Sequence, residues 1–401
     1  MNIVQVNLGL FGSTGKIMLG IEKATASGNR HCKVYPELKQ NLPPGKNDIL
    51  ITGVLSRKIN HCLEKVTGYQ GCFSFIRTLR IIRKIDAFHP DIIHLHNLHG
   101  TIINHSMLFH YIKKNNIKTI WTLHDCWAFT AQCPHFVIAR CEKWKKGCHN
   151  CPQYKDYPSA FVDRTKQMWL LKRKWFTNVP NMIIVTPSLW LSGLVKKSYL
   201  KDYEVRVINN GIDLSIFKPT EGTFRKKYQI ANDRVVLLGV AFGWGKKKGL
   251  DVFVDLAKRL DQRFQIVLVG TTDEIDKQLP SNIISIHRTN NQKELAEIYS
   301  AADLFLNPTR EENYPTVNME AIACGTPVIT FDTGGSPEML NEKCGVVIKS
   351  NSVDEMLEKI IDVTMTHQFD RKECVKIAKG FDMHDRFRDY SALYHSMVSR
   401  K

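Results

Sequence analysis

The sequence has no run of about 20 apolar residues, the length that a membrane-spanning helix needs, so no transmembrane segment is expected. Residues 1–7 also lack the basic start and long apolar block of a signal peptide. We therefore expect a chain that stays in the cytoplasm. Hydrophobic residues make up 43% and charged residues 24% of the 401 residues, and these ordinary fractions exclude collagen-like and intrinsically disordered chains.

Acidic residues are scarce in the first half of the chain. Residues 1–210 contain 30 Lys and Arg but only 12 Asp and Glu, whereas the remainder contains 26 and 27. The net charge of +17 therefore lies in the first half, which suggests an anionic partner: nucleic acid, an anionic membrane surface or a phosphorylated substrate. A solvated basic surface is the alternative. Basic groups near an anionic leaflet contribute about 1 kcal/mol each, so a handful would hold the protein peripherally at the inner face of the plasma membrane.

The eleven cysteines do not suggest a disulfide framework, because their number is odd and no secretion signal accompanies them. Four of them lie in a Lys-, Pro- and Gly-rich segment at about 126–155, namely Cys133, Cys141, Cys148 and Cys151. Cys148-His-Asn-Cys151 places two thiolates on one tight knuckle, as in tetrahedral zinc sites. A structural zinc would supply stability that this segment lacks. Four reduced, partly buried thiols are the alternative.

Short apolar runs alternate with helical stretches along the whole chain. Strands are predicted at 3–6, 92–95, 119–123, 182–186, 205–208, 235–240, 265–270, 283–286, 303–307, 327–331 and 345–348. Helices are predicted at 73–87, 107–114, 249–260, 292–301 and 354–365. This alternation is typical of parallel sheets covered on both faces. Because one ordinary sheet does not hold so many strands, we expect an α/β fold of two doubly wound domains.

A turn signal at Asn209-Asn210-Gly211 marks the boundary between the two domains, with a linker and hinge at about 208–220. We expect an N-terminal domain at 1–207 and a C-terminal domain at 208–380. A last helix at 381–401 is expected to pack back on the N-terminal domain. Ligands of open α/β sheets bind beyond the carboxyl ends of the strands, so two such domains face to face would enclose one cleft.

The glycine-rich turn after the first predicted strand, Gly9–Lys16, does not match a nucleoside-triphosphate loop. Leu10 stands where that loop needs Gly, and Ile17 stands where it needs Ser or Thr. The dinucleotide-binding fingerprint is absent from this turn as well. The turn opens a helix, and its N–H groups near Gly12 and Ser13 can approach an anion. A tight turn selected for backbone freedom is an equal alternative.

The segment 307–330 carries the strongest helix signals of the chain. Pro315 suits the first turn of a helix and Gly325 its C-terminal cap. The spacing predicts that Val317, Ala321 and Cys324 share a buried face. The helix start near residues 314–317 follows a strand end, where its N–H groups favour a phosphate.

Two carboxylates flank this helix start, Glu312 just before it and Glu320 in its second turn. A carboxylate there can accept hydrogen bonds from two vicinal hydroxyls, which indicates recognition of a ribose or hexose. A helix cap and a surface residue are the alternatives. The strand-end loop 243–249 contains three lysines and suits a diphosphate, with Lys248 the best placed.

Histidines end two strands of the first half. His94 and His96 share one strand face, but no carboxylate nearby completes a metal pair, so His94 is interpreted as a core histidine. His124, followed by Asp125, is the better candidate for catalysis or substrate positioning.

Together these motifs resemble the retaining glycosyltransferases of family 4, which have the GT-B fold. The resemblance rests on the Glu312/Glu320 pair with Ala321–Val328, on Asn210–Asp213, on Lys248-Gly249 and on Thr122–Asp125. The segment 124–130 with its later cysteines looks like a subgroup used in bacterial exopolysaccharide assembly of the colanic-acid type.

The resemblance implies two Rossmann-like domains facing across a cleft, with a UDP- or GDP-linked sugar donor held by the second domain. Glu320 would bind the ribose, Glu312 the transferred sugar, and Lys248 with the helix start the diphosphate. The implied catalytic residues are His124 and Glu312. The implied donor-binding residues are Gly12, Ser13, Lys248, Asn313, Tyr314, Thr316, Val317 and Glu320. The acceptor would be a glycan or a polyprenyl-diphosphate-linked sugar, and no nucleic acid is expected as a partner. The reaction would retain the anomeric configuration without a metal cofactor, so any zinc would be structural.

Two departures from the family pattern concern the diphosphate. Asn313-Tyr314-Pro315 replaces a common Gly-Phe-Gly, and Pro315 offers no N–H. Trp244 lies where the family often has an Arg, and Lys246 or Lys247 would substitute for it. Two further hypotheses are a GT-B sugar-nucleotide epimerase or hydrolase, and a zinc-containing nucleic-acid-binding protein. The nucleic-acid hypothesis leaves Glu312 and Glu320 unexplained.

Overall fold

The chain folds into two compact units, which are described separately. The computed structural model describes residues 1–36, 43–349 and 351–399. Unit 1 consists of Met1–Asn209 and the chain from Arg386 onward, and unit 2 is Asn210–Asp385. The predicted domain boundary lies two residues earlier, at 207–208. The chain crosses between the units twice, once in each direction.

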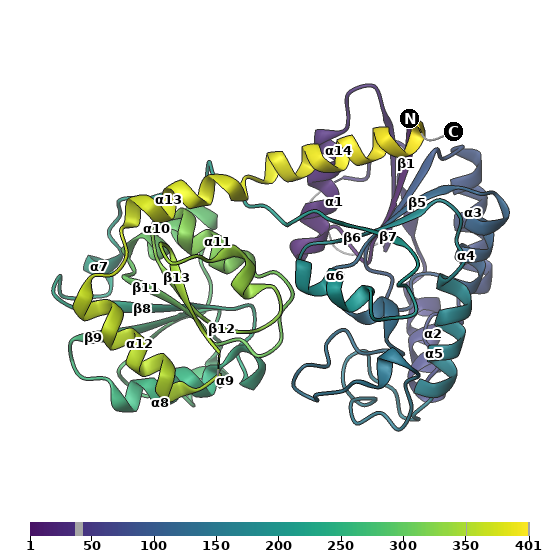
Figure 1. The fold of residues 1–401 in the computed structure, drawn as a ribbon. Coiled ribbons are helices and arrows are strands. Elements are labelled where there is room, and N and C mark those ends of the chain that lie inside the picture. The colour runs from purple at the N-terminus through teal and green to yellow at the C-terminus, as the bar shows by residue number, and fades with distance from the viewer. Residues whose placement is uncertain (37–42, 350, 400–401) are drawn as a thin grey trace. The chain divides into compact units, whose positions relative to one another are not determined.

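Unit 1 contains a seven-stranded parallel sheet with the order β3-β2-β1-β4-β5-β6-β7 (Figure 1). Its strands are β1 Asn2–Val6, β2 Arg30–Pro36, β3 Ile49–Ile51, β4 Ile92–Leu95, β5 Lys118–Thr122, β6 Met182–Thr186 and β7 Glu204–Val207. Strands β2 and β3 were not predicted, because β2 begins with polar residues and ends in proline, and β3 has only three residues. The other five strands lie where the apolar runs predict them.

The helices of unit 1 cover both faces of this sheet. They are α1 Gly12–Ala24, α2 Val54–Thr67, α3 Phe75–Ala87, α4 His105–Lys114, α5 Thr165–Phe176, α6 Leu189–Val195 and α14 Met383–Ser399, with single 3₁₀ turns at Trp127–Phe129 and Lys143–Lys145. One apolar cluster joins Val4 and Leu95 of the sheet to Ile81 of α3, Leu108 of α4 and Met168 of α5. Helices α1 and α14 lie on the opposite face.

Helix α14 completes the core of unit 1 from the far end of the chain. The Tyr394 hydroxyl lies 2.6 Å from His94 Nδ1, and the Tyr390 hydroxyl lies 3.2 Å from Thr122 Oγ1. His94 Nε2 lies 2.8 Å from the same Thr122 oxygen, and all four side chains are buried. Polar groups on this face of the sheet therefore find their hydrogen-bond partners in the last helix, which offsets the cost of burying them.

Unit 2 contains a six-stranded parallel sheet with the order β10-β9-β8-β11-β12-β13. Its strands are β8 Val235–Val240, β9 Phe264–Val269, β10 Ile283–Ile286, β11 Leu304–Asn307, β12 Val328–Phe331 and β13 Gly345–Ile348. All six were predicted from the apolar runs. Strands β8 and β11 are neighbours at the centre of the sheet, although 63 residues lie between Val240 and Leu304.

The apolar side chains of these strands alternate between two core clusters. In β8, Val236 and Leu238 belong to one cluster and Leu237 to the other, as the period of two in a strand requires. The helices are α7 Phe224–Lys227, α8 Leu250–Arg259, α9 Asp273–Asp276, α10 Gln292–Ala301, α11 Thr316–Ala323, α12 Val353–Thr366 and α13 Arg371–Ala378. Single 3₁₀ turns lie at Lys246–Lys248, Ser336–Met339 and Lys379–Phe381. Helices α10, α11 and α13 cover one face, and α8 and α12 cover the other. Two doubly wound parallel α/β units are thus confirmed.

The two segments that leave unit 2 are paired with each other. Ile212 N donates to the Phe381 carbonyl at 2.8 Å, and Met383 N donates to the Ile212 carbonyl at 3.0 Å. A parallel bridge joins Ile212 to Asp382. The chain therefore enters and leaves this unit at one place.

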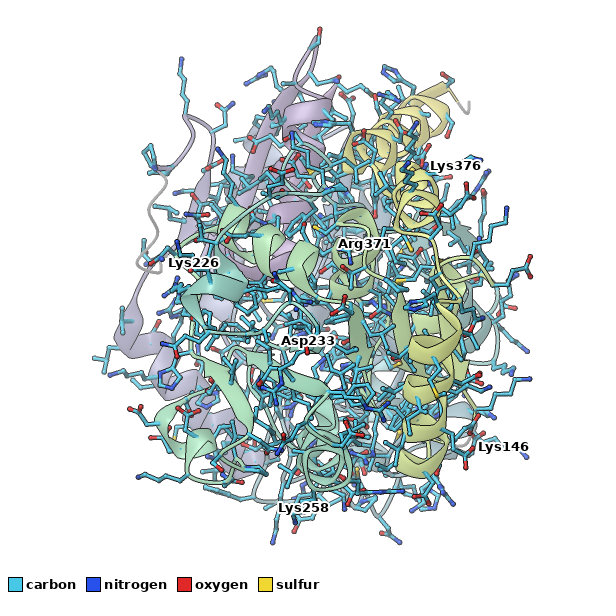
Figure 2. All side chains as sticks on the ribbon, turned by 90° about the vertical axis from the view of Figure 1, so that its left-hand side faces the viewer. Lys146, Lys226, Asp233, Lys258, Arg371 and Lys376 are labelled. Carbon is cyan, nitrogen blue, oxygen red and sulfur yellow. The ribbon has the colours of Figure 1, made fainter. Side chains whose placement is uncertain are left out.

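Charged side chains are spread over the exposed surface of both units. Figure 2 labels Lys226, Lys258 and Lys376 of unit 2 and Lys146 of unit 1, all of them exposed. Among the described residues, no helix has the length and apolar content that crossing a bilayer requires.

The packing of α14 on α1 predicts that alanine at Gly20 destabilises the protein, although alanine usually stabilises a helix. A Cβ there would lie 2.1 Å from the Phe387 ring of α14, whereas a Cβ on Gly193 of α6 meets no atom within 4 Å. Alanine is otherwise favoured over glycine inside helices by about 0.5–1 kcal/mol. We expect Gly20→Ala to lower the free energy of unfolding by about 1–3 kcal/mol, measured with urea, and Gly193→Ala to leave it unchanged or raise it.

Replacing the Phe387 ring with a smaller side chain gives the control for this test. Phe387→Leu in the Gly20→Ala background is expected to recover part of the loss, because the added methyl group then finds room. Equal losses for both glycine variants would contradict the close contact between α1 and α14.

Candidate active site

The loops that follow β8 and β11 are joined to each other at the carboxyl edge of the unit 2 sheet. Arg310 N donates to the Lys247 carbonyl at 2.8 Å, and its guanidinium donates to the Lys246 carbonyl at 2.7 Å. The same guanidinium binds both carboxylate oxygens of Asp251, at 2.8 and 2.9 Å. This two-pronged contact fixes the orientation of both groups. Arg310 was not predicted as a site residue, because its partner Asp251 lies 59 residues away and no local sequence pattern links the two.

The structure brings two predicted site residues, Lys248 and Glu312, into direct contact. Lys248 Nζ lies 2.6 Å from Glu312 Oε2, and both side chains are half-buried. Beside this pair, Lys247 Nζ lies 2.9 Å from Glu311 Oε2. Lys247 is thereby engaged, and Trp244 packs on Phe253 while donating to the Val269 carbonyl at 3.0 Å. Two lysines of the loop after β8 are therefore paired with two glutamates of the loop after β11.

Helix α11 begins at Thr316, one residue later than predicted. Pro315 is the N-cap rather than a residue of the first turn, and no side chain caps this end. Thr316 and Val317 form the first turn, with Val317 only half-buried instead of fully on the core face. The Tyr314 side chain is buried in the apolar core, so at this position only the backbone is available to a ligand.

Asn313 and Glu312 also contact the loop after β12. Gly335 N donates to the Asn313 carbonyl at 2.6 Å. Gly334 has a φ of +58°, and a Cβ on it would lie 2.0 Å from the Glu312 carbonyl oxygen. Only glycine permits this approach, so the loops after β11 and β12 are packed backbone to backbone.

A buried tyrosine orients Glu320 of α11. The Tyr299 hydroxyl, on α10, donates to Glu320 Oε2 at 3.0 Å, while Glu320 itself is half-buried. Burial and the neighbouring carboxylate raise the pKa of Tyr299 well above its usual range, which keeps the hydroxyl a donor. Tyr299 was missed by the sequence analysis, since only its place on α10 opposite α11 reveals the role.

In unit 1, His124 belongs to a chain of polar groups at the ends of three neighbouring strands. His124 Nε2 lies 3.2 Å from His96 Nδ1, and His96 Nε2 lies 3.1 Å from Gln5 Oε1. Burial lowers the pKa of His124 to about 4, despite the opposing effect of Asp125. At neutral pH the imidazole is therefore uncharged. The ring of His94 stacks on that of His96, with centroids 4.2 Å apart, which places both on the predicted face.

Gly12 and Ser13 form the first turn of α1, where the backbone is exposed. Gly12 has a φ of +70°, and no side chain caps this helix. A Cβ on Gly15 would lie 2.2 Å from the Leu10 carbonyl carbon, so the turn also requires glycine for close packing. The anion-binding and tight-turn interpretations are therefore compatible.

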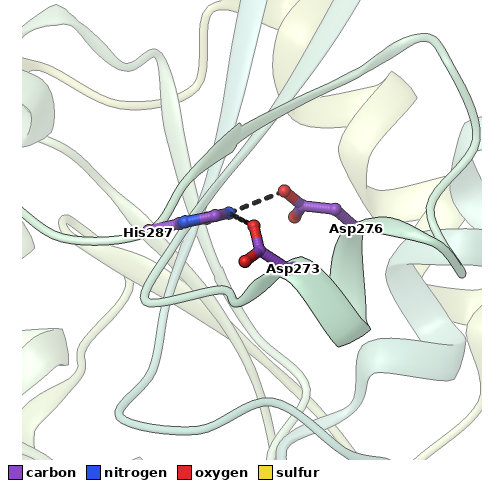
Figure 3. Close-up of side chains that lie close together, drawn as sticks. All are labelled: Asp273, Asp276 and His287. Atoms are coloured by element: carbon purple, nitrogen blue, oxygen red, sulfur yellow. Dashed lines mark hydrogen bonds and ion pairs between the residues drawn. The ribbon is translucent and has the colours of Figure 1, made fainter.

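The four cysteines predicted to bind zinc line one small cavity of unit 1, and Cys133 Sγ lies 4.0 Å from Cys151 Sγ. A tighter group of metal-type ligands occurs elsewhere, in unit 2. Asp273, Asp276 and His287 have ligand atoms within 4.8 Å of one another (Figure 3). His287 Nε2 lies 2.7 Å from Asp276 and 3.8 Å from Asp273. These contacts between an exposed imidazole and two carboxylates account for the group without a metal.

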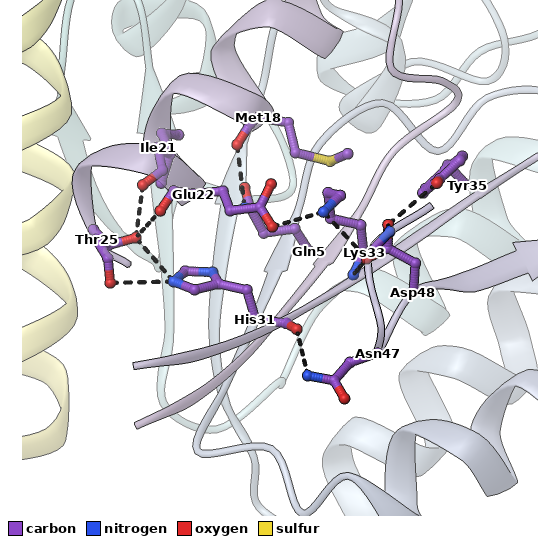
Figure 4. Close-up of polar contacts among 11 residues, drawn as sticks. Gln5, Met18, Ile21, Glu22, Thr25, His31, Lys33, Tyr35, Asn47 and Asp48 are labelled. Carbon is purple, nitrogen blue, oxygen red and sulfur yellow. Dashed lines mark hydrogen bonds and ion pairs between the residues drawn. The ribbon is translucent and has the colours of Figure 1, made fainter. Parts of the chain in front are cut away.

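A second polar cluster, in unit 1, holds α1 to the edge of the sheet (Figure 4). Lys33 of β2 is buried, and its Nζ lies 2.6 Å from Glu22 and 3.2 Å from Asp48. The Tyr35 hydroxyl donates to the same Asp48 carboxylate at 3.2 Å. Two carboxylates thus neutralise one buried ammonium group, which gives this cluster a structural role.

Comparison with known proteins supports one class for both units. The family described as Glycosyltransferase Family 4 matches residues 54–216, and the family described as Glycosyl transferases group 1 matches residues 233–365. Sucrose-phosphate synthase from Thermosynechococcus elongatus has a solved structure that matches the whole chain with a TM-score of 0.72 at 16% identity. All of that synthase chain is covered too, so the fold is GT-B.

Two named relatives match this chain over only part of their own length. The colanic acid biosynthesis glycosyl transferase WcaC of Escherichia coli K12 is 25% identical over 67% of this chain and 66% of its own length. An Escherichia coli protein named UDP-Gal:α-D-GlcNAc-diphosphoundecaprenol α-1,3-galactosyltransferase is 26% identical over 52% of this chain and 58% of its own length. The chain thus spans slightly under two thirds of these relatives. It belongs to the GT-B glycosyltransferases that join a family 4 domain to a group 1 domain.

The buried histidines of unit 1 predict a loss of stability in mild acid. Burial lowers the pKa of His94 to about 3 and those of His105 and His124 to about 4. A histidine in the unfolded chain has a pKa near 6.5. Below that pH the unfolded state therefore binds protons that the folded state does not bind. We expect the free energy of unfolding to fall between pH 6.5 and 4 by about 1.4 kcal/mol per pH unit for each such histidine.

Urea unfolding at several pH values measures this slope. His94→Gln should reduce the slope of stability against pH by the contribution of one histidine. His110→Gln changes an exposed side chain and should leave the slope as in the parent. A parent whose stability is flat from pH 7 to 5 would contradict the buried neutral histidines.

Proposed function

We propose that this chain is a retaining glycosyltransferase that moves a sugar from a nucleoside-diphosphate sugar to a lipid-linked glycan. The proposed context is the synthesis of a bacterial cell-surface polysaccharide. The family supports glycosyl transfer, and the names of WcaC and of the galactosyltransferase support the context and the lipid diphosphate acceptor. The observation that carries the donor site is the grouping of Lys248, Glu312 and Glu320 around the start of α11.

Each of these groups suits one part of a donor. Glu320, held by the Tyr299 hydroxyl, would present its carboxylate to the vicinal hydroxyls of a ribose. Lys248 and the uncapped start of α11 provide positive charge for the diphosphate. As a donor binds, Lys248 would exchange its contact with Glu312 for a phosphate oxygen, which leaves the Glu312 carboxylate to the hydroxyls of the transferred sugar. Asn313, Thr316 and Val317 would contribute backbone groups.

The chemistry proposed for this site is electrostatic. Departure of the diphosphate places negative charge near Lys248 and the helix dipole, which lowers the barrier. The acceptor then attacks from the face that the leaving group occupied, and a leaving phosphate oxygen receives its proton. Neutral His124 would donate or accept a hydrogen bond at the sugar ring without adding charge. No metal cofactor is part of this proposal. The matched relatives named above include no nucleic-acid-binding protein, epimerase or hydrolase, and we propose none of these functions.

Calorimetric titration with UDP and GDP tests the donor site. We expect the parent to bind one of them, with UDP favoured by the name of the galactosyltransferase relative. Glu320→Ala should raise the dissociation constant roughly ten- to hundredfold, because charged hydrogen bonds contribute about 1.5–3 kcal/mol. Tyr299→Phe should raise it about two- to tenfold through loss of orientation alone.

The matched control is Glu358→Ala, which removes an exposed glutamate from α12 in the same unit. It should bind the nucleotide as the parent does. Failure of the parent to bind either nucleotide would overturn the donor site, as would an unchanged affinity in Glu320→Ala.

A helix with its apolar face outward supports peripheral binding to an anionic membrane. In α2 the exposed side chains include Leu55, Ile59, Leu63 and Val66, which lie three or four residues apart on one stripe. The only carboxylate of α2, Glu64, points inward and accepts a hydrogen bond from Gly71 N at 2.9 Å. A helix that exposes its apolar stripe and buries its acidic residue has the pattern of an interfacial helix.

The start of α3 extends this surface. Phe75 and Ile76 are 60% and 71% exposed, and Asn60 Nδ2 of α2 donates to Ser74 Oγ at 2.7 Å, which places the two helices side by side. We call the exposed apolar residues of α2 and α3 the α2–α3 surface: Val54, Leu55, Ile59, Leu63, Val66, Phe75, Ile76 and Leu79. Exposed Lys58, Arg80, Arg83 and Lys84 lie on the same two helices. Apolar groups for the acyl boundary and basic groups for anionic headgroups are thus combined.

Co-sedimentation with vesicles tests this surface. The parent should bind vesicles that contain phosphatidylglycerol, bind less in high salt, and bind pure phosphatidylcholine weakly. Leu55→Ser with Ile76→Ser should reduce binding at least tenfold, because two apolar side chains leave the bilayer. Leu189→Ser changes an equally exposed leucine of α6 and should bind as the parent does. Equal binding by all three proteins would contradict the α2–α3 surface.

A further inference from the structure

The segment between β5 and α5 contains little regular structure of its own. From residue 123 to residue 164 it forms only two 3₁₀ turns, Trp127–Phe129 and Lys143–Lys145. Its apolar centre is the buried Trp144, whose ring lies 5.2 Å from that of Phe129 and 5.1 Å from that of Phe136. These rings and Trp127 belong to the main apolar cluster of unit 1, and Cys141 and Cys148 pack against the same cluster.

Four thiols line one cavity in this segment. Cys133, Cys141, Cys148 and Cys151 are half-buried and line a single cavity of about 20 Å³, enough for one water-sized particle. Cys133 Sγ and Cys151 Sγ lie 4.0 Å apart. Two thiolates on a tetrahedral zinc lie about 3.8 Å apart, given a Zn–S bond of about 2.3 Å. That pair therefore has nearly the required spacing.

The backbone around the cysteines is arranged as thiolates require. Backbone N–H groups of Ala131 and Gln153 donate hydrogen bonds to the sulfurs of Cys148 and Cys151. Lys143 donates to the carbonyls of His149 and Asn150, at 3.1 and 3.0 Å, and so holds the knuckle between these two cysteines. His149 Nδ1 is engaged by the Gly147 carbonyl at 2.9 Å and its side chain is exposed, so the ligand set is four cysteines.

A buried lysine lies beside the cluster, and negative charge there would stabilise its protonated form. Lys172 of α5 is fully buried, with its Nζ 3.5 Å from the centre of the Trp127 ring and hydrogen-bonded to the Trp127 carbonyl. Among the described residues no ion pair joins it to a carboxylate, and the groups near its amine that can carry negative charge are Cys148, Asp125 and Cys133. A buried cation without an anion is costly. Four thiolates on a divalent metal carry a net charge of −2, which Lys172 would partly compensate.

We propose that Cys133, Cys141, Cys148 and Cys151 bind one structural zinc ion, with Lys172 as the buried counter-charge. Binding replaces the four S–H bonds with four Zn–S bonds and releases the protons to solvent. Zinc binding is therefore expected to weaken as the pH falls. The metal joins the start of the segment to its end and orders the chain that directly follows His124. This inference is independent of the donor and the acceptor proposed above.

Elemental analysis of the purified full chain, by mass spectrometry, tests the proposal first. We expect about one zinc per chain, retained through dialysis against a weak chelator. Cys148→Ser and Cys133→Ser should lose the metal, whereas Cys62→Ser, which changes an exposed cysteine of α2, should keep it. Lys172→Met should bind zinc more weakly with all four ligands in place.

Cobalt substitution keeps the test informative where a cysteine variant fails to fold. Cobalt(II) in the parent should show the intense visible bands of a tetrahedral thiolate site. Parent protein without zinc, together with octahedral cobalt spectra, would overturn the proposal. So would a Cys148→Ser variant that retains one zinc per chain.

Discussion

The pairing of β8 with β11 is the constraint on which the candidate site depends. Phe305 lies opposite Leu238, and each strand ends two residues later, at Asn307 and Val240. Because the two strands end at one level, the loops that follow them start side by side although they are far apart in sequence. The contacts of Arg310 with Asp251 and of Lys248 with Glu312 then fix these loops to each other. The same edge carries the loop after β12, pressed against Glu312 through Gly334.

The sequence was sufficient for the parts of this site that depend on local rules. Gly325 has a positive φ and follows Cys324, the C-cap of α11, and Glu320 lies in the second turn as its spacing predicts. Two doubly wound α/β domains followed from strands that alternate with helices, and the GT-B fold was expected from the resemblance to the family 4 glycosyltransferases. Pro315 was placed one residue too far into the helix, because proline is favoured on either side of that boundary.

Contacts between distant elements could not be predicted in the same way. Tyr299 of α10 and Arg310 look like ordinary members of their segments until the sheet order sets their neighbours. The composition revealed the positive charge of the first half but not that α2 turns its apolar stripe outward. That orientation follows from inward contacts of Glu64 and Asn60, which no helical period distinguishes from solvent-facing ones. The roles assigned to the site residues are proposals that rest on the family and on this geometry.

Unit 1 departs from the usual distribution of residues in two places. Gln5, His94 and Thr122 place polar groups inside, where the tyrosines of α14 or neighbouring histidines satisfy them. The α2–α3 surface places apolar groups outside. Both departures lie in unit 1, and unit 2 also buries polar residues on its strands, among them Gln265, Asn307 and Thr330. The half with the unusual distribution is also the one that carries the excess of positive charge.

The position of α14 has a consequence for how the protein forms during synthesis. Unit 2 is one continuous stretch, so all of it has been made before the final helix leaves the ribosome. His94 and Thr122 of unit 1 are made early, yet their hydrogen-bond partners Tyr394 and Tyr390 follow 300 and 268 residues later. The strands of unit 1 are therefore made long before the helix that completes their core, and a nascent chain leaves this polar strand face uncovered until α14 has been made.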